Sequence, residues 1–193
     1  MSSDSSVAGY LAPANAPAPL EDASFEDFLH DLFVGVSGMD PKLVRPRWQV
    51  EPPNQPTGDW MAFGITRIAP DTYAAVIHDA GGSGSDQLQR HETVEVLISS
   101  YGPNASKNLS LLRDGLQIEQ NRAVLTQNGM GLEATGEMIP VPTLAKNQWL
   151  RRYDLLFTMR RQILRSYPVL SLLSSQGTIN NQVETVPINV NAP

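Results

Sequence analysis

The sequence of 193 residues contains no cysteine. This absence excludes disulfides, zinc sites with thiolate ligands and a cysteine nucleophile. Charged residues make up a low 18% of the chain, whereas its 41% hydrophobic content is ordinary for a globular protein. No apolar run approaches the roughly 20 residues that span a bilayer, and the first residues lack the basic and apolar regions of a secretory signal. These absences favour a globular protein that is assembled in a reducing cytoplasm.

Basic residues are missing from the beginning of the chain. Residues 1–41 hold seven acidic residues and no Lys or Arg, so the remainder carries all 14 basic residues and 13 acidic ones. An acid-only segment is either a solvated tail or a surface that docks on a basic partner. Residues 1–20 are rich in Ser, Ala and Pro and show no periodicity, which predicts an extended or disordered arm.

Recognisable motifs of catalysis and metal binding are also missing. His30, His78 and His91 are far apart and lie in no spacing that holds a metal ion. The sequence has no GxSxG elbow. The glycine-rich residues 81–85 lack the Lys-Ser/Thr ending of a phosphate-binding loop, and we interpret them as a tip that joins two strands. We therefore predict no enzyme activity, no metal and no cofactor; an enzyme built on dispersed carboxylates and His91 is the least favoured alternative.

The most regular stretch runs from residue 91 to residue 125. Residues 91–100 alternate between apolar and polar side chains, which predicts a strand. Residues 105–116 place apolar side chains along one face of a helix, with Asn104 as its N-cap. A second short helix follows. We interpret this stretch as a packing unit around which the rest of the chain is organised.

Similar patterns predict the flanking elements. Ser24 caps an apolar-faced helix that Gly38 ends. Residues 149–164 alternate and predict a long strand, although Leu155, Met159 and Ile163 also fit helical spacing. The other predicted elements are a proline-rich extended connection (42–58), a hairpin of two strands (60–68 and 72–79), a broken edge strand (132–141) and a terminal strand or arm (183–190).

These elements predict the α+β class, with a mainly antiparallel sheet flanked by helices. We divide the chain into a flexible acidic arm (1–23), a single domain (24–178) and a C-terminal arm (179–193).

Basic residues gather between residues 146 and 165, where Asp154 is the only acidic residue. On a strand, Arg160 and Arg161 point to opposite faces, so a continuous stripe that reads DNA is not expected. We interpret these arginines as partners of acidic groups on adjacent subunits, and the acid-only leader could supply those groups. The alternative is a charged rim at an interface. The candidate subunit-interface residues are Arg152, Arg160 and Arg161. Two arginines, Arg45 and Arg47, are too few for a nucleic-acid patch, and we interpret them as part of a solvated linker that Trp48 pins.

Several short motifs, in this order, resemble the core signature of the phage neck/tail terminator family. They are Trp60–Ile65, Arg90–Glu95, Ser99–Pro103, Leu112–Leu116, Gln120–Arg122 and Trp149–Tyr167, and together they span about Trp48 to Gly177. The motif residues that we single out are Tyr101, Gly102, Pro103, Arg113, Asp114, Asn121 and Arg122.

The resemblance implies a structural protein of the virion. Six copies would form a ring at the neck that caps the tail tube, contacts the head connector and leaves a channel for DNA. Its partners would be the tail tube protein, a sheath protein where the tail has one, and the neck proteins. No cofactor, membrane or sequence-specific DNA binding would be involved. Assembly would take place in the host cytoplasm. The alternative is a non-viral module that binds a small ligand or a protein without catalysis.

The composition of the leader leads to a first prediction. Limited proteolysis of the isolated subunit should remove residues up to about residue 20 without unfolding the rest, because the segment has too little apolar surface to pack stably. Mass spectrometry would locate the cut and circular dichroism would follow the remainder. A leader that resists protease in the monomer would contradict this prediction.

Overall fold

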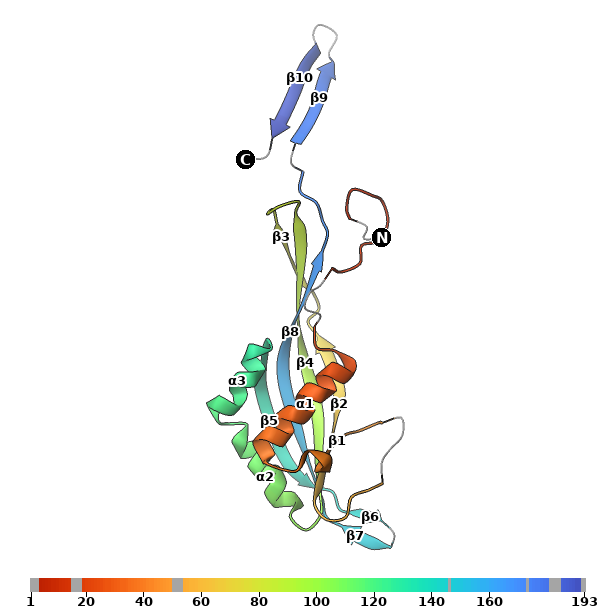
Figure 1. Ribbon diagram of the computed structural model, residues 1–193, viewed down its shortest axis with the longest axis vertical. Helices are drawn as coiled ribbons and strands as arrows, with labels where there is room; N and C mark the ends of the chain where they lie inside the picture. Colours follow the sequence, from red (N-terminus) through yellow and green to blue (C-terminus); the bar gives the residue numbers. More distant parts are fainter. Residues whose placement is uncertain are drawn as a thin grey trace. The chain divides into compact units, whose positions relative to one another are not determined.

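The computed structural model describes residues 4–14, 19–49, 54–145, 147–172, 174–180 and 185–191, and its chain is drawn in Figure 1. It divides into two compact units. The larger comprises Pro19–Ala74 and Arg90–Ile163, and the smaller comprises Met1–Ala18, Ala75–Gln89 and Leu164–Pro193.

The larger unit is built on a sheet whose strands follow the order β1-β2-β4-β8-β5. These strands are β1 (Val44–Pro46), β2 (Trp60–Pro70), β4 (Ser85–Tyr101), β5 (Met130–Pro140) and β8 (Arg152–Tyr167). The pairs β2–β4 and β5–β8 are antiparallel, whereas β1 runs parallel to β2. The mixed α+β class with a mainly antiparallel sheet, and the long strand after residue 149, are therefore confirmed.

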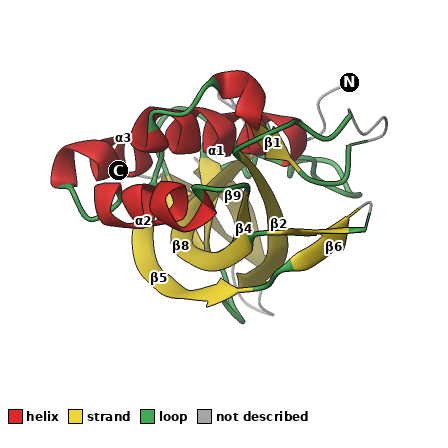
Figure 2. Cartoon of the chain, turned by 90° about the horizontal axis from the view of Figure 1, so that it is seen from below, coloured by secondary structure: helices red, strands yellow, loops and turns green. Residues whose placement is uncertain are grey.

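Helices cover one side of this sheet, as Figure 2 shows. They are α1 (Asp22–Ser37), α2 (Ala105–Gly115) and α3 (Glu119–Gln127), and a 3-10 turn, η1 (Pro41–Leu43), follows α1. A short hairpin of β6 (Thr143–Ala145) and β7 (Gln148–Leu150) precedes β8. Among the described residues, none of the helices is both long and apolar enough to cross a membrane.

The core lies between the helices and the sheet. Alternation along β8 buries Leu155, Phe157 and Met159 completely, whereas Leu156 and Arg160, which alternate with buried residues, are exposed. Phe33 of α1 meets Phe63 and Phe157 edge to face, at ring-centroid distances of 5.2 and 5.8 Å. The predicted apolar stripe of α2 is also fully buried: Ala105, Leu109, Leu112 and Leu116.

A close approach of α1 and α2 depends on Gly115 at the end of α2. A Cβ atom at this position would lie 2.6 Å from Cγ1 of Val36, which is closer than two carbon atoms can pack. Glycine therefore lets the two helices meet there.

The predicted hairpin of residues 60–68 and 72–79 is wrong. Strand β2 continues through Ala69 and Pro70 and pairs with β4. In the smaller unit, β3 (Ala75–Asp79) also pairs with β4, across the glycine-rich turn at residues 81–84. We expected Pro70 to turn the chain, because proline is common in loops. A proline is tolerated at the end of a strand, however, and Pro70 is the last residue of β2.

Both predicted helix caps also need correction. Helix α1 begins at Asp22, two residues before Ser24, which lies inside the first turn and accepts a hydrogen bond from the Glu21 backbone N–H at 3.1 Å. Asn104 is the N-cap residue of α2, as predicted, but its side chain donates to Asp59 at 2.8 Å instead of accepting from the helix. The predicted helix end at Gly38 is confirmed, with a left-handed φ of 68°.

Parts of both predicted arms can be described within the smaller unit. Ser5 N–H donates to the Pro168 carbonyl at 3.0 Å, and Ala14 N–H donates to that of Ser166 at 2.8 Å. Strand β9 (Ser174–Asn180) pairs with β10 (Thr185–Asn191), so the terminal strand forms. Other positions of the predicted arms and of the proline-rich connection lie outside the described residues: 1–3, 15–18, 50–53, 181–184 and 192–193.

The buried stripe of α2 yields a second prediction. Replacing Leu112, which has no exposed surface, with Asp should lower the free energy of unfolding by about 5 kcal/mol, because a charge would be desolvated and packing lost. The matched control is Leu111→Asp on the same helix, where the side chain is 50% exposed; its cost should stay below about 1 kcal/mol. Urea denaturation would measure both, and equal costs would contradict the burial of this face.

Candidate interaction surface

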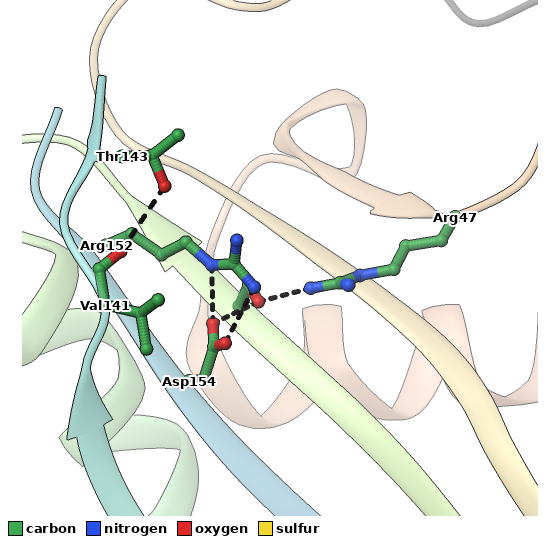
Figure 3. A network of polar contacts seen from close by, with 6 residues as sticks. Arg47, Val141, Thr143, Arg152 and Asp154 are labelled. Atoms are coloured by element: carbon green, nitrogen blue, oxygen red, sulfur yellow. Dashed lines mark hydrogen bonds and ion pairs between the residues drawn. The ribbon is translucent and has the colours of Figure 1, made fainter. Parts of the chain in front are cut away.

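The sheet face opposite the helices carries a polar network, shown in Figure 3. Arg152 donates two hydrogen bonds to Asp154, from Nε at 2.8 Å and from a terminal nitrogen at 2.7 Å. The Ser99 hydroxyl also donates to Asp154, and Arg47 donates to Ser99. The hydrogen bonds to Asp154 raise the pKa of Arg152, and burial opposes this effect. The network thus ties β8, β4 and the segment after β1 together on one face.

An aromatic stack borders this network. The rings of Trp60 on β2 and Tyr101 on β4 are parallel to within 5°, with centroids 4.1 Å apart. These two residues face each other in the strand register. The Arg152 guanidinium lies 5.6 Å from the Tyr101 ring centre, within the range of a cation–π contact.

A cavity of about 480 Å³ lies beside the stack. It is lined by Arg45, Pro46, Arg47, Trp48, Gln49, Gln55, Pro56, Trp60, Ala62, Tyr101, Thr143 and Leu150. Trp48 lies against β2, where a Cβ at Gly64 would come within 2.6 Å of its ring. Its backbone adopts a left-handed φ of 58°, a conformation that costs about 1–2 kcal/mol for a residue with a side chain. Such strained residues gather at functional sites.

Two of the residues that line the cavity each hold a buried donor that has no acceptor among the described residues: Nε of Arg47 and Nε1 of Trp60. Such a donor costs about 1–3 kcal/mol. Arg45, in contrast, donates to the carbonyls of Lys42 and Asn54 at 2.9 and 3.0 Å. Because the charged residues of the described lining are both arginines, the cavity suits a ligand or partner that presents oxygen acceptors.

The paired arginines of β8 point to opposite faces, as the alternation predicted. Arg160 lies on the polar face and binds Asp71 at 2.6 Å and Thr93 at 3.1 Å, with its side chain 44% exposed. Arg161 lies on the helix side and is 5% exposed.

The charge of Arg161 is compensated inside its own subunit. It binds Glu92 at 2.8 Å, donates to the Leu20 carbonyl at 3.0 Å and lies 4.5 Å from the centre of the Phe25 ring. Arg152 and Arg160 therefore share the polar face, whereas Arg161 joins α1 to the sheet.

The motif residues Tyr101, Gly102 and Pro103 form a corner at the end of β4, and Gly102 lies at its centre. Its φ is 104°, and a Cβ there would lie 2.5 Å from both the Gly58 carbonyl oxygen and an Asp59 carboxylate oxygen. Asp59 also accepts from the backbone and side-chain nitrogens of Asn104, both at 2.8 Å. Pro103 is exposed in the turn. Tyr101 alone of the three corner residues reaches the cavity.

The other motif residues lie at the junction of α2 and α3. Asn121 donates to the Gly115 carbonyl at 2.8 Å and so holds the two helices together. Arg113 and Asp114 form an exposed ion pair at 3.0 Å. Nε of Arg122 is buried and has no acceptor within the part of the chain that the structure describes. The structure thus divides the motif between this junction and the corner.

The cavity and its unpaired donors were not predicted from the sequence. Arg47 and Trp48 were interpreted as a solvated linker, and Trp60 only contributed to the resemblance. The clue in the sequence was two tryptophans and two arginines within residues 45–60. In the described part of the chain, no group of three or more metal-ligating residues forms.

The two arginines provide a third prediction. Arg161→Ala should lower the free energy of unfolding by about 3 kcal/mol, because it removes a buried side chain and leaves the Glu92 carboxylate, which is only 15% exposed, uncompensated. Arg160→Ala is the matched control: its half-exposed ion pair should contribute less than about 1 kcal/mol. Thermal and urea unfolding of the purified subunits would compare them. A larger loss from Arg160→Ala would reverse our assignment of the two faces.

Comparison with known proteins agrees with this architecture. A family model described as "Phage neck terminator protein" matches residues 23–188, which is most of the chain. A search among curated proteins found no match. The family match covers the helix–sheet core and all of the motif residues, and on this basis the chain belongs to the phage neck terminator protein family.

Proposed function

We propose that six copies of this protein form a ring at the neck of the virion, where the ring caps the tail tube and joins it to the head connector. The observation that carries the proposal is the family match over residues 23–188. Membership indicates a structural neck protein of a bacteriophage, and it favours this role over a non-viral binding module. DNA would pass through the centre of the ring without being read.

The exposed surface of the larger unit supports a role in assembly. Three large apolar side chains are exposed at or near the cavity: Trp48 (69%), Leu144 (58%) and Trp149 (73%). Contiguous exposed apolar surface is typical of protein interfaces, where tryptophan and arginine are enriched. We assign Arg152 and Arg160, on the same sheet face, to the contacts between subunits.

The proposed role requires binding rather than chemistry. Partners would be the tail tube protein, a sheath protein where the tail has one, and the connector proteins of the head. The ring would assemble in the host cytoplasm, before or during the joining of head and tail.

The fourth prediction concerns the ring itself. Purified protein should elute with six times the 21.1 kDa mass of one chain in multi-angle light scattering, and negative-stain images should show closed rings with a central hole. A phage whose gene for this protein carries a stop codon should release tails without attached heads. Monomers in solution together with normal particles from the mutant phage would contradict the proposal.

A further inference from the structure

We infer that the cavity beside Trp60 and Tyr101 receives the acidic outer face of α1 from a second copy of this chain. The inference rests on the proposed ring and identifies the two surfaces that meet at each interface between neighbouring subunits.

The described lining of the cavity is positively charged. Its charged lining residues are Arg45 and Arg47, and none of its described lining residues is acidic. Carboxylates only accept hydrogen bonds when ionised, and charge-assisted hydrogen bonds are the stronger kind. A carboxylate-bearing surface therefore complements the charge of the two arginines.

The outer face of α1 supplies carboxylates for which no Lys or Arg of the helix competes. Asp27 and Asp31 lie four residues apart on the exposed side of the helix, and the Asp31 side chain is 87% exposed. The basic neighbour on α1 is His30, whose Nδ1 lies 3.1 Å from a carboxylate oxygen of Asp31. Residues 1–41 contain no Lys or Arg. Beyond this segment, basic residues slightly outnumber acidic ones, so the complementary charge lies elsewhere in the chain.

The two surfaces lie on opposite sides of the same sheet. Met61 and Phe63 of β2 point into the core, where Phe63 contacts Phe33 of α1. Trp60 and Ala62 alternate with them and line the cavity on the other side. Since the sheet separates α1 from the cavity, the two surfaces can meet only between different copies. A contact of unlike surfaces repeats from copy to copy and closes a ring when the rotation permits.

Charge reversal tests this joint. The double variant Asp27→Lys/Asp31→Lys should weaken association roughly thirtyfold or more, because it removes charge-assisted contacts and places like charges together. The same is expected of Arg45→Glu. Light scattering over a concentration series would measure association, and melting curves would show that each variant is folded.

Two further chains make the result specific. Glu119→Lys/Glu137→Lys changes the net charge equally at exposed positions of α3 and β5 and should keep the ring. Combining Asp31→Lys with Arg45→Glu in one chain should restore part of the association, because the reversed charges attract again. Restoration would not follow if either substitution acted by damaging its own subunit.

Cysteine pairing tests the contact without changing many charges. The native chain has no cysteine. A Gln55→Cys chain, altered at the exposed rim of the cavity, is mixed with an Asp31→Cys chain and oxidised. Disulfide-linked dimers joining the two different chains should form, whereas Gln55→Cys mixed with Glu137→Cys should give none above background.

The outcomes separate this inference from the proposed function. The inference is overturned if the wild-type chain forms rings and the α1 reversal variant forms them equally well. It is also overturned if the charge-control variant weakens the rings as much as the α1 reversal does. The proposed ring would remain in both cases. If the α1 reversal variant still forms rings but these rings no longer attach to the head connector, the inference is also overturned, because the acidic face would then bind a different partner. A wild-type chain that forms no ring, alone or in particles, would overturn both.

Discussion

Edge-to-face packing of Phe33 against Phe63 and Phe157 fixes α1 on one face of the sheet. Aromatic pairs of this kind add about 0.5–1.5 kcal/mol each to the free energy of burial, and they set the orientation of both partners. Because period-2 alternation then sends every second residue to the other face, Arg152, Asp154 and Ser99 must lie together there. The core on one face thus determines the polar surface on the other.

Most of the fold of the larger unit could be predicted because its signals are local. The stripe of α2, the alternation of β8 and the glycine that ends α1 each act through neighbours in the sequence. The hairpin failed because pairing of both β2 and β3 with β4 is decided by contacts that are distant in sequence. The position of the cap at Asn104 was predicted, but its side-chain bond was not, since the acceptor of that side chain is Asp59, 45 residues earlier.

The candidate surface was only partly predictable. Alternation showed that Arg160 and Arg161 diverge, but it could not show which of them meets Glu92 and Phe25 inside the subunit. The cavity forms only when the segment after β1 folds across β2, and that approach depends on the absence of a side chain at Gly64. The unpaired donors of Arg47 and Trp60 result from this tertiary arrangement, and no spacing in the sequence predicts them.

The account joins these features into a subunit with two unlike surfaces, an acidic helix on one side of the sheet and an arginine- and tryptophan-lined cavity on the other. A cryo-electron microscopy map of the neck in intact particles tests this most directly. The account predicts a sixfold ring in which α1 of each copy covers the Trp60–Tyr101 cavity of the next. A ring in which α1 faces solvent or a different protein, with the cavity uncovered, would contradict it.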